Sequence, residues 1–211
     1  ESYQRELKLM PILLRNAQQG MRLDMNGLER DMPAMVAGIE KTDIWLRKKL
    51  GIENIDSDKQ LGEALYNKGI VTDFKRTAKG QLSVSKKTLT MNKFKDPQVY
   101  HALQYRGQMA TSVSMFIKPW LDLGTEGNGV IYPNWSQVRS PRGNKTGGAS
   151  SGRIICSRPN FLNIPKKWKR AASAGYVHPA WLKVPELPYI RTYCLPDKGQ
   201  QWGKRDFNQQ E

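Results

Sequence analysis

The sequence has few of the residues that build metal and redox centres. Only two cysteines and two histidines occur among 211 residues, and neither Cys156 nor Cys194 belongs to a C-x-x-C motif. No zinc site is therefore predicted, and both cysteines are expected to be reduced, as in a cytoplasmic protein. No apolar run approaches the roughly 20 residues of a membrane span, and no signal peptide is visible. We therefore expect no membrane partner.

Acidic residues are also scarce relative to basic ones. The chain has 34 Lys and Arg against 19 Asp and Glu, which gives a formal net charge of +15. Residues 138–211 alone have 14 basic and 4 acidic residues, a net charge of +10. Such an imbalance indicates a polyanionic partner, and nucleic acid fits it best. The alternative is a solvated basic face that only improves solubility.

The first half of the chain shows helical patterns. Apolar residues at helical spacing predict a helix over 2–19. Asp24 or Asn26 can cap a second helix that ends near residue 50, and Pro33 predicts a kink or a later start in it.

Further helices are predicted on either side of a basic loop. A capping box opens a helix over 57–67, and the polar segment 72–85 is predicted to be a loop. Ser85 can cap a short helix that ends near residue 91. The pair Asp96-Pro97 predicts the start of a helix over 97–121.

The composition changes after residue 123. Gly, Pro, Ser and Asn become dense, and the pairs Val130-Ile131 and Ile154-Ile155 indicate short strands. The sequence therefore predicts an α+β fold with two regions, a helical one over 1–123 and a strand-and-loop one over 124–211.

Two carboxylates stand at the C-terminal end, in the segment Asp206-Phe207-Asn208-Gln209-Gln210-Glu211. A carboxylate beside a basic chain is a natural ligand of Mg²⁺, which prefers hard oxygen donors and substrate phosphates. The alternative is an exposed tail with two ordinary acids, and the residues alone leave both interpretations open.

A second polar segment, 150–165, has donors suited to DNA. Arg153, Arg158, Asn160 and Asn163 can bond phosphates or the acceptors that every base pair offers in the minor groove. The alternative is a turn-rich loop whose asparagines bond their own backbone.

Three motifs stand in a fixed order here: Ser151-Gly152-Arg153, then Ser157 to Pro165, then Asp206 to Glu211. In type and order they resemble consecutive landmarks of family A DNA polymerases, the DNA polymerase I type, and look most like its bacteriophage branch. Weaker similarities to the thumb of that family lie upstream: Ser57-x-x-Gln60-Leu61, residues 77–85 and Leu103-Gln104-Tyr105-Arg106.

The resemblance implies an incomplete polymerase right hand, with a helical thumb over 1–123, whose N-terminal helix packs on the palm, and the first part of a β-sheet palm over 124–211. Asp206 would be a catalytic metal ligand together with the main-chain carbonyl of Phe207. Gln209 and Glu211 would bind the incoming nucleotide. Residues implied to contact DNA are Arg153, Asn160, Asn163, Lys167, Arg106, Lys79, Ser83 and Ser85.

The resemblance also implies partners and limits. The reaction would be template-directed addition of deoxynucleotides to a primer 3′ end with two Mg²⁺ ions, and the partners would be primer-template DNA and deoxynucleoside triphosphates. One carboxylate cannot hold two metals, so we expect no activity without a second polypeptide carrying the fingers and the rest of the palm. A phage-encoded protein would act in the host cytoplasm.

Departures from the family pattern leave two other functions open. Ala110 and Ser112 stand where lysines are usual, and 166–188 is longer than usual. The chain could instead be a non-catalytic DNA-binding clamp derived from a polymerase, or a basic scaffold that binds nucleic acid loosely.

Overall fold

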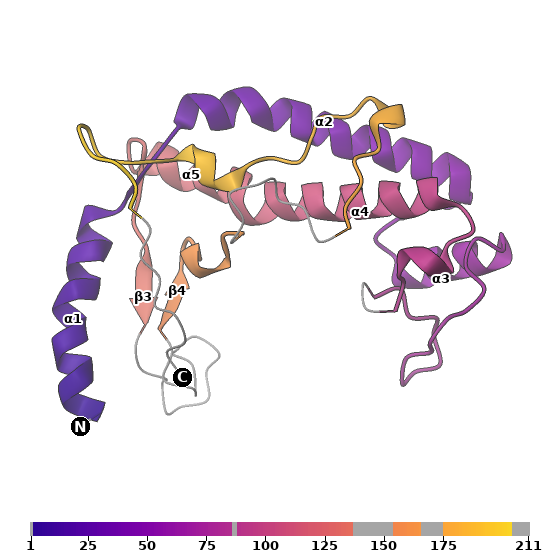
Figure 1. Cartoon of the computed structure of the whole chain (residues 1–211), viewed down its shortest axis with the longest axis horizontal. Coiled ribbons are helices and arrows are strands. Elements are labelled where there is room, and N and C mark those ends of the chain that lie inside the picture. The colour runs from indigo at the N-terminus through magenta and orange to yellow at the C-terminus, as the bar shows by residue number, and fades with distance from the viewer. Residues whose placement is uncertain (1, 86–87, 137–153, 166–174, 204–211) are drawn as a thin grey trace. The chain divides into compact units, whose positions relative to one another are not determined.

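The structure is a computed structural model that describes residues 2–85, 88–136, 154–165 and 175–203 (Figure 1). The chain divides into two compact units. The first contains the described residues of Glu1–Arg30, Met115–Trp168 and Tyr189–Glu211, and the second those of Asp31–Ser114 and Lys169–Pro188. Neither unit is a continuous stretch of chain, so the functional division into 1–123 and 124–211 stays a prediction.

The first unit contains two small antiparallel sheets. β1 (Met21–Leu23) lies between β2 (Val130–Ile131) and β5 (Cys194–Leu195) in one sheet, and β3 (Asn134–Ser136) pairs with β4 (Ile155–Ser157) in the other. The predicted short strands near 130 and 155 are thus confirmed.

The remaining elements of this unit are helical. α1 (Ser2–Gln19) precedes β1, and α5 (Lys118–Glu126) precedes β2. Three-residue to four-residue 3-10 helices occupy Phe161–Asn163 and Ile190–Tyr193.

Gly20 makes the turn from α1 into β1. Its φ is +68°, a conformation that side chains with a Cβ disfavour. A Cβ at this position would lie 2.7 Å from Val130 Cγ1 and 2.9 Å from the carbonyl oxygen of Ile131. The close approach of β2 therefore requires glycine here.

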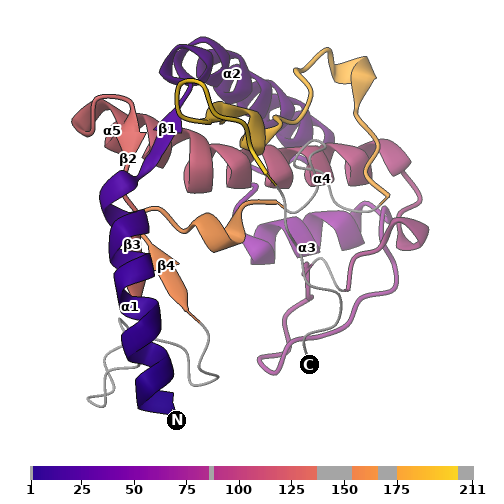
Figure 2. The same cartoon turned by 60° about the vertical axis from the view of Figure 1, so that its left-hand side comes forward.

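The second unit is mainly helical. It contains most of α2 (Met25–Leu50), together with α3 (Asp58–Asn67) and α4 (Pro97–Ser112), and α2 and α4 run side by side in both ribbon views (Figures 1 and 2). Shorter 3-10 helices cover Met91–Lys93 and Ala180–Leu182. Its core includes the fully buried side chains of Leu46, Leu50, Leu65, Val71, Val99, Tyr105 and Met109.

Local capping explains where the main helices begin. The Asp24 carboxylate accepts a hydrogen bond from the Gly27 N–H at 3.0 Å, and that of Asp96 accepts one from the Gln98 N–H at 3.0 Å. The Asp96 cap was predicted from the sequence, and Asp24 was one of the two residues predicted to cap α2. The predicted capping box at Ser57 is only half formed: Ser57 Oγ accepts from the Gln60 N–H, whereas Gln60 Oε1 accepts from the Asn54 N–H.

Two helix predictions were wrong. The described residues between 85 and 90 form no helix, because the Thr88 and Leu89 N–H groups close a single turn on the Ser85 carbonyl and a 3-10 helix begins only at Met91. The helix from Pro97 does not end near residue 121, because a π-helical segment, Val113–Ile117, links α4 to α5. Helical structure continues through α5 to Glu126, and Pro119 is the second residue of α5, directly after the π-helical segment. Pro33 lies inside α2, which begins at Met25, so the helix does not start at this proline.

No helix in the described part of the chain is long and apolar enough to span a bilayer.

Candidate nucleic-acid interface

The predicted basic loop is an ordered hairpin. Arg76 and Leu82 pair in an antiparallel bridge, and the Ser83 N–H bonds the Lys75 carbonyl at 2.8 Å. At the tip, the Thr77 N–H bonds the Gln81 carbonyl at 2.8 Å. These bonds order the backbone that carries the basic residues of the segment.

Lys79 is placed at the tip of this hairpin. It is exposed and is followed by Gly80, whose φ of +77° makes the reverse turn. The Arg76 guanidinium donates to the Gly80 carbonyl at 2.7 Å and stays exposed. The tip thus presents two cations to solvent on a braced turn, which suits contact with phosphates.

Ser83 and Ser85 converge on Thr88. The Ser83 and Ser85 hydroxyl oxygens lie 3.2 Å and 3.0 Å from Thr88 Oγ1, which also lies within bonding distance of both serine carbonyls. Ser85 is exposed and Ser83 half-buried. The structure therefore brings two predicted DNA-contacting hydroxyls together at the base of the hairpin.

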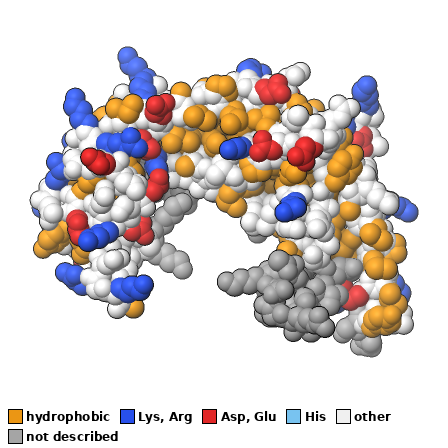
Figure 3. Space-filling view, turned by 180° about the vertical axis from the view of Figure 1, so that it is seen from behind, with side chains coloured by type: hydrophobic (Ala, Val, Ile, Leu, Met, Phe, Trp, Pro, Cys, Tyr) orange, Lys and Arg blue, Asp and Glu red, His pale blue; other side chains and the backbone are white. Residues whose placement is uncertain are grey.

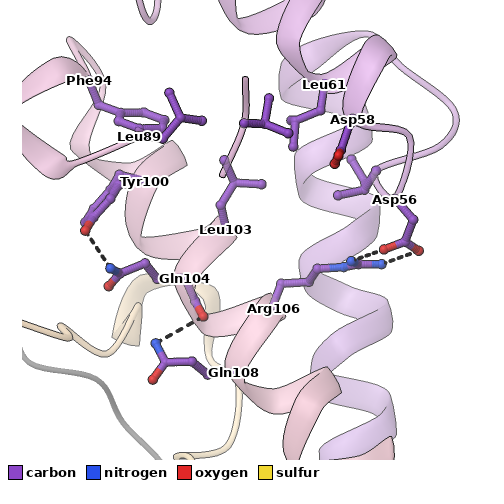
Figure 4. A pocket seen from close by; sticks show the side chains of 13 residues that line it. Asp56, Asp58, Leu61, Leu89, Phe94, Tyr100, Leu103, Gln104, Arg106 and Gln108 are labelled. Carbon is purple, nitrogen blue, oxygen red and sulfur yellow. Dashed lines mark hydrogen bonds and ion pairs between the residues drawn. The ribbon is translucent and has the colours of Figure 1, made fainter. Parts of the chain in front are cut away.

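Arg106 is already paired in the structure. Its Nε bonds Asp43 Oδ1 at 2.8 Å, and its Nη1 and Nη2 bond both oxygens of the Asp56 carboxylate, Nη2 at 2.8 Å from Oδ2 (Figure 4). Hydrogen bonding to Asp56 raises the pKa of Arg106, and the hydrogen bond from Arg106 lowers the pKa of Asp56. The guanidinium joins α4 to α2 and to the segment before α3, and its predicted phosphate contact remains a prediction.

A cavity of about 470 Å³ lies beside Arg106 (Figure 4). Its apolar wall comes from Ile55, Leu61, Val84, Leu89, Phe94 and Leu103. The polar wall includes Gln104, whose Nε2 bonds the Tyr100 hydroxyl at 2.5 Å, while its buried Oε1 has no hydrogen-bond partner among the described residues.

Asn160 and Asn163 lie in the first unit. The Asn160 side chain accepts a hydrogen bond from the Leu162 N–H at 3.1 Å and caps the 3-10 helix Phe161–Asn163. This is the local bonding that the alternative interpretation anticipated, although Asn160 and Asn163 are both exposed. Their contact with DNA therefore stays a prediction.

The end of this segment is anchored to the sheet region. Arg191 Nε bonds the Pro165 carbonyl at 2.6 Å, and the Trp202 indole N–H bonds the Cys194 carbonyl at 3.1 Å. A cavity of about 250 Å³ is lined by Met21, Phe161, Ile164, Arg191, Cys194, Trp202 and Gly203. Both cysteines are free thiols.

Several predicted site residues lie outside the described residues: Arg153, Lys167, Asp206, Phe207, Gln209 and Glu211. Within the described ranges, no group of three or more His, Cys, Asp or Glu could hold a metal ion. The metal and nucleotide assignments therefore rest on the sequence.

Residues 25–211 match the sequence-family model of DNA polymerase family A. The chain belongs to DNA polymerase family A. It is 26% identical over 211 residues to the DNA polymerase DpoZ of Vibrio phage phiVC8, an alignment that covers 96% of this chain and 30% of that protein. It is also 25% identical over 224 residues to the DpoZ of Salmonella phage PMBT28, across 100% of this chain and 33% of that protein. This family A chain thus spans about a third of the length of these phage relatives.

A solved structure supports the fold. The family A chain aligns with the polymerase domain of Pol1 from M. smegmatis, solved in complex with DNA primer-template and dNTP, with a TM-score of 0.64 and 21% identity. The alignment covers 79% of this chain and 27% of that one. The predicted mixture of helices with small sheets is thereby confirmed. The family match and the two DpoZ relatives confirm the resemblance to phage family A polymerases.

Sequence reasoning missed the two carboxylates that hold Arg106 in this family A chain. Asp43 and Asp56 lie 63 and 50 residues before Arg106, and no local spacing signals such long-range pairing. The hairpin was also missed, although Gly80 at its tip is an ordinary turn signal that could have indicated it.

Proposed function

We propose that this chain is part of a template-directed DNA polymerase that adds deoxynucleotides to a primer 3′ end. The observation that carries the proposal is the family match, which runs through residue 211 and so includes the motif from Asp206 to Glu211. A pure clamp has no use for carboxylates that face phosphates, because they repel DNA. Phage DNA polymerases among the relatives favour action in the host cytoplasm.

The proposed thumb, residues 1–123, holds the primer-template duplex. Lys79 stands at the tip of the hairpin, with the hydroxyls of Ser83 and Ser85 at its base, and both kinds of group donate to phosphate oxygens. To bind a phosphate, the Arg106 guanidinium would release the exposed Asp56 carboxylate and bond the phosphate in its place. Its ion pair with Asp43 would stay intact. Such contacts position a duplex without reading its sequence, as a polymerase requires.

The proposed palm, residues 124–211, contributes part of the reaction centre. Asp206 and the Phe207 carbonyl would be ligands of Mg²⁺, and Gln209 and Glu211 would lie against the incoming nucleotide. Two bound Mg²⁺ ions would stabilise charge on the attacking and leaving oxygens of the phosphoryl transfer. Arg153, Asn160, Asn163 and Lys167 would position the primer-template near this centre.

A complementing polypeptide is part of the proposal. The motif from Asp206 to Glu211 supplies one metal-binding aspartate, and two metals need further carboxylates. The fingers and the rest of the palm would come from that polypeptide. We expect no primer extension by these 211 residues alone.

Primer extension with Mg²⁺ and deoxynucleotides tests the proposal. The chain is assayed alone, joined to the unmatched part of the phiVC8 DpoZ, and in that joined form with Asp206→Ala or with the control Asp122→Ala, an exposed acid of α5. We expect extension only by the joined protein, abolished by Asp206→Ala and retained by Asp122→Ala. Extension that survives Asp206→Ala removes the metal assignment. Salt-sensitive duplex binding without any extension supports the clamp instead.

A further inference from the structure

Helix α1 exposes an unusual number of large apolar side chains. Tyr3, Leu7, Met10, Ile12 and Leu14 are each between 40% and 71% exposed, all within 12 consecutive residues. Single exposed apolar residues are normal on a protein surface, whereas a contiguous group marks an interaction site. Figure 3 shows hydrophobic side chains along the right-hand edge, where this helix lies.

Four of these side chains form one stripe. At 3.6 residues per turn, Tyr3, Leu7, Met10 and Leu14 fall within an arc of about 60°. We call these four residues the α1 stripe. Ile12 lies on the opposite side of the helix, and the basic residues Arg5, Lys8 and Arg15 share that side with it.

The stripe continues a surface that the helix already uses. Going round the wheel from the stripe, Ala17 and Leu13 come next and then Leu9, and all three are half-buried. The C-terminal end of the helix is fixed to its own unit, because the Trp135 indole N–H bonds Asn16 Oδ1 at 2.9 Å. The apolar sector of α1 is therefore wider than the part that the described residues of its own unit cover, so a further surface fits against it.

The comparisons indicate what that surface is. The alignment with the PMBT28 DpoZ covers all of this chain, α1 included, yet only 33% of that polymerase. In such a protein the other two thirds of the polypeptide are covalently attached, so their effective concentration near α1 is far above that of any separate partner. A polypeptide surface also suits an uncharged stripe better than DNA, which requires cations.

We propose that the α1 stripe is a docking surface for the polypeptide that lies outside the matched third in the phage relatives. This inference rests on the proposed function, in which that polypeptide carries the fingers and the rest of the palm. The stripe supplies an apolar contact that holds the two parts together independently of the reaction centre.

Thiol labelling tests the docking. Leu7→Cys and, as a matched control on the opposite side, Ile12→Cys are each made in this chain alone and in the chain joined to the unmatched part of the phiVC8 DpoZ. Labelling by a maleimide is followed at each site by mass spectrometry. We expect Leu7→Cys to react at least about tenfold more slowly in the joined protein, since burial blocks thiol access, and Ile12→Cys to react at the same rate in both.

A second measurement uses separate chains. The 211-residue chain is mixed with the separately produced remainder of the phiVC8 DpoZ, and Met10→Glu should abolish their co-elution while Ile12→Glu leaves it intact. Equal labelling of Leu7→Cys in both contexts, or co-elution indifferent to Met10→Glu, overturns the inference.

Other occupants give different results. If labelling of Leu7→Cys in the isolated chain slows as the protein concentration is raised, the stripe binds a second copy of the chain. If labelling slows only when anionic vesicles are added, the stripe binds a membrane surface. Either result overturns the inference. Primer extension is measured on the same joined protein: extension with an unprotected Leu7→Cys removes the docking alone, and protection without extension removes the proposed function alone.

Discussion

Arg106 and Asp43 form a two-point ion pair between α4 and α2, with Nε 2.8 Å from Oδ1 and Nη2 3.4 Å from Oδ2. Both side chains are largely buried, at 16% and 14% exposure, whereas Asp56 on the other side of the same guanidinium is 72% exposed. The two carboxylates therefore share one cation but differ in how much water competes for it.

The first prediction compares these two carboxylates. Asp43→Asn should lower the free energy of unfolding by about 1–3 kcal/mol, because it weakens a sheltered charge-assisted hydrogen bond. Asp56→Asn should cost less than about 1 kcal/mol, as exposed ion pairs do. Urea unfolding of both variants measures the difference, and equal losses would contradict the role given to burial.

The second prediction concerns acid. The hydrogen bond from Arg106 lowers the pKa of Asp56 below its usual 3.8. A carboxyl with a lowered folded-state pKa contributes stability above the pKa of the unfolded state and loses it as the pH falls through the folded-state pKa. Unfolding followed from pH 5 downward should therefore show a loss of stability below about pH 4 that is smaller in Asp56→Asn. An identical pH profile in this variant would contradict the coupling to Arg106.

The third prediction uses two glycines of the second unit as a matched pair. A Cβ at Gly38 would lie 2.6 Å from the Tyr105 hydroxyl and 2.8 Å from Pro185 Cδ, whereas one at Gly107 would meet nothing within 4 Å. Gly38→Ala should lower the melting temperature and cost about 1–3 kcal/mol through overpacking. Gly107→Ala, in the middle of α4, should be neutral or stabilise by up to about 1 kcal/mol. Stabilisation by Gly38→Ala would show that α2 does not pack this closely on Tyr105.

The fourth prediction concerns DNA. Lys79→Ala should weaken duplex binding and lower the slope of log K against log salt by about 1, since one phosphate contact is lost. The free energy of unfolding should not change, because Lys79 is exposed at the hairpin tip. Lys118→Ala, an exposed lysine of α5, is the control with the same charge change. Equal weakening by both variants would assign binding to total charge, as expected of a loose scaffold.

The fifth prediction concerns the thiols. Burial raises the pKa of Cys194 to about 12, and burial also raises the pKa of Cys156, whose Sγ donates to the Pro159 carbonyl. Little thiolate is then present at neutral pH. Both cysteines should react slowly with a disulfide reagent in the native protein and quickly after denaturation. Fast native reaction of Cys156 would contradict its placement.

Helix starts were predictable because their signals are local. Asp96 and Pro97 specify the beginning of α4 from two adjacent residues. The path of the helix beyond Ser112 was not predictable, because a π-helical segment, Val113–Ile117, shifts the hydrogen bonding there and no local residue pattern signals it. The predicted end near residue 121 was too early, because helical structure continues through the π-helical segment and α5 to Glu126.

The candidate site was predictable in its residue types but not in its pairing. The basic character of 72–85 was plain, and the hairpin confirms that these residues lie together. That Arg106 would be held by Asp43 and Asp56 depends on tertiary contacts between distant segments, which no motif encodes. For Asn160 both interpretations were stated, and the structure shows the local hydrogen bond while leaving the DNA contact to experiment.

The pairing of β1 with β5 has a consequence for synthesis on the ribosome. Arg22 and Leu23 emerge early, but their partners Leu195 and Cys194 follow roughly 170 residues later. At about 5–20 residues per second, the central strand of this sheet waits on the order of ten to thirty seconds for its second neighbour. During that interval a strand edge stays open to wrong pairing, so slower translation should increase aggregation of the nascent chain.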